Sequence, residues 1–353
     1  MAKRYSSKKG RKIEPAVQNL FFAFPSWDGV STLSSQRYID LSQVASLVNR
    51  RFYRQGTQWT VSKISIHFPE LSAGETILSR PSITVSKLPN TWVMSNAWIK
   101  GFKTWQRMNN KALEEAESVR PKFLDFKIYA DQEHCNLGYA ANLLPLANGG
   151  LYTAGEWVPS KYIVPNTAVP AGVQNFEVKA VGANYGAGSA SGLAAVSLIE
   201  GYAASRGLPN INDPNTPDDA ADASGATPQN WMSALFNEGT SQDDQVLTDM
   251  VFENNEAPYP FENDGTHTDT MYPGGANQGT GLEIHDFKQF TSTTLSNTIT
   301  MDGGVFPCGL MKFTNPITYA DADGATIIKD AVLHIQLIPG NHRGYLCESM
   351  MEM

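Results

Sequence analysis

The sequence predicts a mainly β protein, an antiparallel β-sandwich that carries an inserted acidic region of mixed structure. Three observations support this fold class. The 353 residues include 29 glycines and 20 prolines, which is typical of β-rich proteins with many turns and long loops. Segments rich in β-forming residues lie toward both ends of the chain, separated by turn residues such as Pro89-Asn90 and Pro339-Gly340. Between them lies a region that is acidic and rich in Asn and Pro.

The expected elements follow from the period of the apolar residues. A short helix is expected at 37–52, where apolar residues recur at rough helical spacing. Strands are expected at 58–68, 75–78, 82–86, 92–95, 123–130, 176–181, 298–301, 309–313 and 331–338. Further helices are expected at 98–118, 193–205 and 231–236. Strands on both sides of the acidic region must pair to cover their edges, and a sandwich with one long excursion meets this requirement.

The charge of the chain is unevenly distributed along its length. The net charge is −8, but no Lys or Arg occurs between Arg206 and Lys288, and that stretch holds fifteen acids. The rest of the chain would carry +7 without them. A polarised chain can place one face on a polyanion and another in solvent. We therefore expect residues 185–287 to form an acidic surface insertion that faces outward.

A basic arm opens the chain. Residues 1–14 are rich in Lys, Ser and Gly and predict a disordered segment. Its cations are Lys3, Arg4, Lys8, Lys9, Arg11 and Lys12. Such arms bind phosphates by releasing counterions, and six contacts to a single strand give a salt slope of roughly −4 in log–log terms. The arm predicts nucleic-acid binding without sequence specificity, although a solvated tail or a nuclear import signal has the same composition.

A second basic cluster lies at Arg50, Arg51 and Arg54, with Phe52 and Tyr53 between the arginines. The aromatic rings could stack on bases while the guanidiniums hold phosphates. They could equally pack inward while the arginines face solvent. The nine cations of the arm and of this cluster are the predicted nucleic-acid-binding residues.

No catalytic motif occurs in the sequence, so we expect a protein that is not an enzyme and has no catalytic residues. The glycine run at 186–192 has one residue too many for a dinucleotide fingerprint. Cys135, Cys308 and Cys347 are isolated and are expected to be small buried hydrophobes. No metal site and no cofactor are expected, except that paired acids could hold calcium between subunits. Asp321-x-Asp323-Gly324 resembles the start of a calcium loop, but a hairpin turn is the favoured interpretation.

The chain resembles the capsid proteins of small circular single-stranded DNA viruses, above all the smacovirus group. The resemblance rests on the basic opening Ala2-Lys3-Arg4-Tyr5, the β-rich body, and the closing motif Leu337-Ile-Pro-Gly-Asn-His-Arg-Gly-Tyr-Leu346. It implies a jelly-roll shell domain, self-assembly into an icosahedral shell and packaging of a circular DNA genome. The arm is shorter than the arginine-rich arms of many such capsids, so inner-face residues such as Arg50, Arg51 and Arg54 would have to help.

The resulting domain prediction has three parts: a basic arm at 1–14, a jelly-roll shell domain at 15–184 and 288–353, and the acidic insertion at 185–287. The expected partners are further copies of the chain, genomic nucleic acid and a host receptor. The virion, and the host cell during assembly, are the expected locations. No apolar run approaches the roughly 18 residues that span a membrane, so no membrane partner is expected.

Two other functions fit part of the sequence. A nucleic-acid-binding module that is not viral would bind DNA without forming particles. A carbohydrate-binding or hydrolytic β-sandwich would use exposed tryptophans, with Trp27, Trp92, Trp98, Trp105 and Trp157 as candidates. Tryptophans in a sandwich more often belong to the core or to an interface. Only the resemblance favours DNA over RNA as the packaged nucleic acid.

Overall fold

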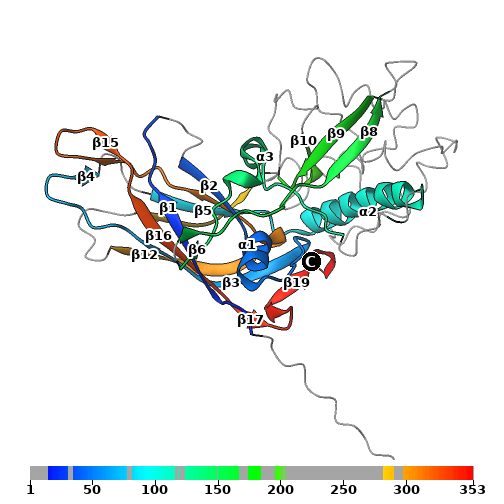
Figure 1. The fold of residues 1–353 in the computed structure, drawn as a ribbon, viewed down its shortest axis with the longest axis horizontal. Coiled ribbons are helices and arrows are strands. Elements are labelled where there is room, and N and C mark those ends of the chain that lie inside the picture. The colour runs from blue at the N-terminus through cyan, green and yellow to red at the C-terminus, as the bar shows by residue number, and fades with distance from the viewer. Residues whose placement is uncertain are drawn as a thin grey trace, which may run out of the picture.

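The structure is a computed structural model (Figure 1). It describes residues 15–30, 35–77, 82–115, 118, 124–148, 150–166, 174–183, 195–199, 202, 281–289 and 297–352. The basic arm, the glycine run at 186–192 and the helix expected at 231–236 lie outside these residues. The mainly β fold class is confirmed, and the two main sheets are antiparallel.

The first main sheet has the strand order β1-β16-β3-β12. Its strands are β1 (Asn19–Pro25), β16 (Asp330–Leu337), β3 (Thr57–His67) and β12 (Thr298–Phe306). β16 pairs with residues 61–67 of β3, and the short β19 (Cys347–Ser349) pairs with residues 57–59. The long strand β3 therefore pairs along its length with two segments from the C-terminal end of the described chain.

The second main sheet has the order β11-β5-β13-β2. Its strands are β11 (Glu283–Gln289), β5 (Ser82–Lys87), β13 (Leu310–Thr314) and β2 (Gln36–Asp40). Side chains of both sheets form one core, in which Phe24 of β1 meets Phe313 of β13 edge to face at 5.8 Å between ring centroids. Burial alternates along β1 and β16, because one face of each strand covers this core.

The pairing of these eight strands is nested along the chain. β1 pairs with β16, β2 with β13, β3 with β12, and β5 with β11, each pair antiparallel. The first four strands of the sandwich thus pair with the last four in reverse order along the chain. The contacts between the pairs, β16 with β3 and β13 with β5, close them into two sheets.

A small sheet lies at one end of the sandwich. β4 (Thr76–Ile77) and β15 (Thr326–Ile327) both pair with β14 (Tyr319–Ala320). In the turn from β14 to β15, the Asp321 Oδ1 atom accepts hydrogen bonds from the amides of Asp323 at 3.0 Å and Ala325 at 2.8 Å. This confirms the hairpin turn expected at Asp321–Gly324, in which Gly324 has a φ of +81°.

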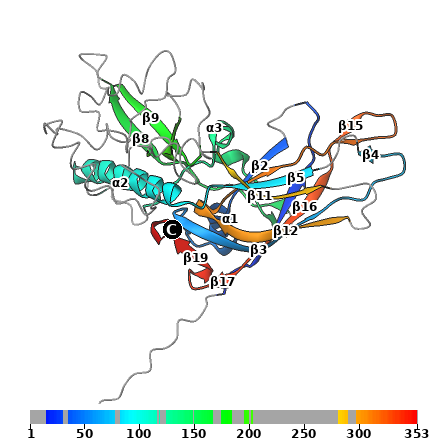
Figure 2. The ribbon, with the colours of Figure 1, turned by 180° about the vertical axis from the view of Figure 1, so that it is seen from behind.

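The chain leaves the sandwich between β5 and β11. The described elements of this connection are α2 (Trp92–Glu115), α3 (Gln132–Leu137), β6 (Leu146–Ala147), β7 (Gly150–Leu151), β8 (Lys161–Asn166), β9 (Gln174–Val181) and β10 (Ala195–Ser197). α2 and the β8–β10 sheet lie at the end of the sandwich away from β4 and β15 (Figures 1 and 2). Most of the predicted insertion 185–287 lies outside the described residues, which here are 195–199, 202 and 281–287. Of these, Val196, Leu198 and Ile199 are buried in a hydrophobic core, and 283–287 belong to β11.

A second hydrophobic core holds the connection together. Trp98, Trp105, Phe126 and Tyr162 pack against one another, with Trp98 and Trp105 only 4% and 8% exposed. The hydroxyl of Tyr162 donates to the carbonyl of Gly101 at 2.9 Å, which fastens β8 to α2. Trp98 and Trp105 are therefore core residues and cannot serve as exposed platforms for a sugar.

Several expected elements are wrong in type. Residues 92–95 begin α2, because Thr91 caps the helix through its hydroxyl and carbonyl and because Val93 and Met94 are buried in the second core. Residues 124–128 form no strand, since side chains satisfy backbone amides there: the Ile128 amide donates to the Gln55 side chain at 2.6 Å. Residues 37–40, which belong to β2, and residues 195–197 form strands although helices were expected there.

Candidate nucleic-acid interface

Helix α1 (Leu41–Asn49) positions the predicted arginines. It begins at Asp40, whose Oδ1 atom accepts from the amides of Ser42 at 2.9 Å and Gln43 at 3.2 Å. It ends at Arg50, which adopts the left-handed conformation with φ 52° and ψ 37°. Glycine is the usual residue at this position of a helix C-terminus. The turn after α1 presents Arg50 and Arg51 on the surface.

The two aromatic residues between the arginines, Phe52 and Tyr53, differ in burial. Tyr53 is fully buried, packs on Trp59 and Tyr345, and donates its hydroxyl to the carbonyl of Arg343 at 3.0 Å. Inward packing is therefore correct for Tyr53. Phe52 is half-buried and contributes to a surface pocket. The side chains of Arg50, Arg51 and Arg54 are exposed.

The closing motif of the chain brings a fourth arginine to the same surface. It forms the hairpin of β17 (Pro339–Gly340) and β18 (Gly344–Tyr345), with Arg343 at the turn in a left-handed conformation of φ 51°. The exposed Arg343 guanidinium donates to the carbonyl of Phe52. Burial lowers the pKa of His342, and the nearby charges of Arg343 and Arg54 lower it further. We call Arg50, Arg51, Arg54 and Arg343 the arginine patch.

The described chain also starts beside this patch. The Val17 amide donates to the Asn49 side chain at 3.1 Å, and the Gln18 side chain donates to the Gly344 carbonyl at 3.0 Å. The buried hydroxyl of Tyr345 donates to the Val17 carbonyl at 2.7 Å. Residues 17 and 18 are thus held between the end of α1 and the β17–β18 hairpin. The predicted arm joins the fold at this point, although its six cations lie outside the described residues.

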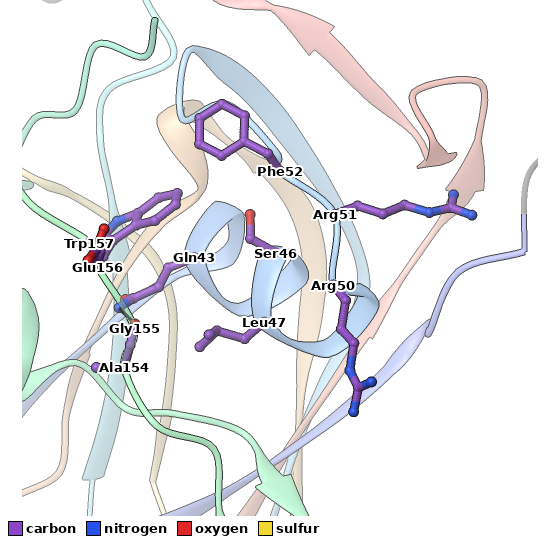
Figure 3. A pocket seen from close by; sticks show the side chains of 10 residues that line it. All are labelled: Gln43, Ser46, Leu47, Arg50, Arg51, Phe52, Ala154, Gly155, Glu156 and Trp157. Carbon is purple, nitrogen blue, oxygen red and sulfur yellow. Dashed lines mark hydrogen bonds between the residues drawn. The ribbon is translucent and has the colours of Figure 1, made fainter. Parts of the chain in front are cut away.

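A pocket of about 260 Å³ lies next to the patch (Figure 3). Its lining residues come from α1, from the turn after it and from the connection: Gln43, Ser46, Leu47, Arg50, Arg51, Phe52, Ala154, Gly155, Glu156 and Trp157. The rings of Phe52 and Trp157 lie 6.5 Å apart between centroids with 51° between their planes. The ammonium of Lys127 lies 4.6 Å from the Trp157 ring and 5.6 Å from the Phe52 ring, which favours this arrangement of the pair.

Buried hydrogen bonds fix the walls of the pocket. The Trp157 indole nitrogen donates to Asp40 Oδ2 at 2.9 Å, and the Gln55 amide group donates to the same oxygen at 3.0 Å. Burial raises the pKa of Asp40 to about 6, against the lowering effect of these donors. The backbone amide of Gln55 donates to Asp125 at 3.1 Å, and Lys127 pairs with that carboxylate at 3.2 Å. The arginine-bearing turn is therefore tied to the connection.

Other predicted residues lie apart from this surface. Cys135 and Cys308 are buried as expected, Cys347 is half-buried, and burial raises the pKa of all three thiols. Within the described ranges, no group of three or more His, Cys, Asp or Glu side chains is placed to hold a metal ion. No helix in the described part of the chain is both long and apolar enough to cross a bilayer.

Three of the four arginines of the patch were predicted from the sequence. Arg343, Lys127 and Trp157 were not predicted to lie beside them. Phe52 and Arg343 are 291 residues apart, so no local pattern could have joined them. No protein-family model, curated protein or solved structure matches this chain.

Proposed function

We propose that this chain is a viral capsid protein with a jelly-roll shell domain, which assembles into an icosahedral shell around single-stranded DNA. The nested pairing of eight strands carries the proposal. In a jelly roll, the first strand pairs with the eighth, the second with the seventh, the third with the sixth and the fourth with the fifth, across two four-stranded sheets. The strand orders β1-β16-β3-β12 and β11-β5-β13-β2 agree with this scheme. Jelly rolls are typical of viral shells and of lectins.

The arginine patch and the root of the arm support a nucleic-acid role over a lectin role. Four exposed guanidiniums lie on the side of the fold where Val17 is held beside Asn49, and the six cations of the arm precede this segment in the sequence. Together these ten charges could contact phosphates of one packaged strand. Glu156 lies at the pocket, so the surface is not uniformly positive. In a shell, this side of the sandwich would face the enclosed nucleic acid.

The closing motif has a structural role under this proposal. Its hairpin holds Arg343 against the turn that bears Arg51 and Phe52, and its Tyr345 holds the start of the described chain. The hairpin and its buried tyrosine thus connect the arginine-bearing turn after α1 with the start of the described chain. The acidic region 185–287 would then face outward, where like charges keep particles apart.

Neutralising the arm tests the proposal directly. A full-length variant with all six arm cations replaced by Gln should assemble with less nucleic acid, and its ratio of absorbance at 260 and 280 nm after nuclease treatment should fall. The matched control replaces Lys103 and Arg107, exposed cations of α2, and should package like the unmodified chain. Equal nucleic-acid content in all three proteins would contradict a packaging role of the arm.

The outward position of the acidic region has a separate test. Intact particles should be cleaved by a protease within residues 185–287 and protected at residues 1–14. Cleavage confined to 1–14 would contradict this orientation.

A further inference from the structure

We propose that the pocket between α1 and residues 154–157 binds an unpaired nucleobase of the packaged strand, and so favours single strands over duplex. This inference rests on the proposed function. It assigns Phe52 and Trp157 a role in binding bases, beside the phosphate-binding role of the arginines.

The size of the pocket suits one base. A closed apolar cavity of about 150 Å³ can bind benzene, and pockets for drug-sized ligands begin at about 300 Å³. The pocket is a surface hollow that opens to solvent, and its volume of about 260 Å³ leaves room for a planar group of one or two rings. The two aromatic rings are 6.5 Å apart and tilted, so a base would stack on one ring with the other as a side wall.

The residues that line the pocket offer one region suited to a base and another suited to a phosphate. Figure 3 shows the rings of Phe52 and Trp157 at the pocket while the side chains of Arg50 and Arg51 extend away from the ring pair. A nucleotide has the same division, with an aromatic base at one end and a charged phosphate at the other. The exposed carboxylate of Glu156 also lines the pocket and can accept a hydrogen bond from the polar edge of a base.

The ring pair is held in place before any ligand binds. Trp157 is fixed by its hydrogen bond to the buried Asp40, and Lys127 lies against both rings. A wall that is already ordered loses little side-chain entropy on binding, which improves affinity. Stacking on an aromatic side chain tolerates any base, so the pocket would not select a sequence.

Duplex DNA cannot use this pocket, because its bases are already stacked and paired inside the helix. Entry would require a base to leave the stack, which costs a few kcal/mol. The phosphate contacts of the arginine patch are open to both forms. The pocket therefore adds affinity only for strands with free bases.

The test compares two oligonucleotides of equal charge and length, an oligothymidylate and an abasic deoxyribose-phosphate chain, by fluorescence anisotropy with the full-length protein. We expect the base-bearing oligonucleotide to bind on the order of tenfold more tightly. Phe52→Ala should abolish this preference and leave affinity for the abasic chain unchanged, which also shows that the patch is still folded. Phe52→Tyr should keep the preference. Phe21→Ala, at a 43% exposed phenylalanine of β1, is the matched control and should also keep it.

The outcomes separate this inference from the proposed function. Equal binding of both oligonucleotides by the unmodified protein, or an unchanged preference in Phe52→Ala, overturns the base pocket and leaves phosphate binding intact. Failure of both oligonucleotides to bind at low salt overturns the nucleic-acid function itself, and the pocket with it.

Discussion

Replacing Arg50 with glycine should stabilise the fold and weaken nucleic-acid binding at the same time. Arg50 has a φ of 52°, in the left-handed region that is unfavourable for a residue with a Cβ atom. A non-glycine residue there costs roughly 1–2 kcal/mol. Strain of this kind at an exposed arginine is understandable if the side chain has a use in binding.

The magnitude follows from two opposing terms. Arg50→Gly removes the left-handed cost, but glycine gives the unfolded chain about 0.5–1 kcal/mol of additional entropy. The net gain in the free energy of unfolding should be about 0.5–1 kcal/mol. The variant also loses one phosphate contact, so the slope of log affinity against log salt for a single strand should become shallower by about 0.7.

Arg51→Gly is the matched control, because it removes the same charge at the next residue without a positive φ. Urea denaturation of the two full-length variants, followed at high salt without nucleic acid, gives the two free energies of unfolding. Arg50→Gly should be the more stable variant, while both lose a similar salt slope. Equal or lower stability of Arg50→Gly would refute the reasoning about strain.

Three further predictions follow from the same contacts. A triple variant in which Gln replaces Arg50, Arg51 and Arg54 should have a slope of log affinity against log salt that is shallower by about 2 for single-stranded DNA, measured by anisotropy from 50 to 200 mM salt. An unchanged slope would show that these arginines do not contact the phosphates. Tyr345→Phe should lower the free energy of unfolding by about 1–3 kcal/mol, because the Val17 carbonyl and the Asn49 amide group each lose a partner; a midpoint shift in urea measures it, and no shift would contradict these bonds. The folded-state pKa of Asp40, about 6, lies above its unfolded value of about 3.9, so its contribution to stability is present below pH 4 and is lost as pH rises through 6. The folded-state pKa of His134, about 4, lies below its unfolded value, so its contribution is lost as pH falls from 6.5 through 4, and the two effects oppose each other. His134→Gln should therefore make stability fall more steeply from pH 4 to 6 than in the unmodified protein, and identical pH profiles in urea would contradict the two assignments.

The sequence predicted strands best where one face is buried and the other polar. β16 was clear for this reason, since Leu333, Ile335 and Leu337 alternate with exposed or half-buried residues. β1 was missed because the outward-facing Phe21, which stacks on His334, interrupts the alternation of its apolar residues. β11 was missed because it is an edge strand in acidic sequence, with Ile284 and Phe287 exposed.

The candidate interface was predicted only as far as local sequence allows. Three arginines and two aromatic residues are visible as a cluster, because they lie within the five residues 50–54. Arg343 and Trp157 reach the cluster through the β17–β18 hairpin and through a hydrogen bond to the buried Asp40. Both contacts depend on tertiary packing, which the period and composition of a single sequence do not encode. The nested strand pairing is likewise a property of the whole fold.

The most direct test of the capsid proposal is electron microscopy of the purified full-length protein, with nucleic-acid content measured after nuclease treatment. We expect uniform closed particles that protect nucleic acid from the nuclease. Single dispersed subunits across a range of salt and calcium concentrations would contradict it.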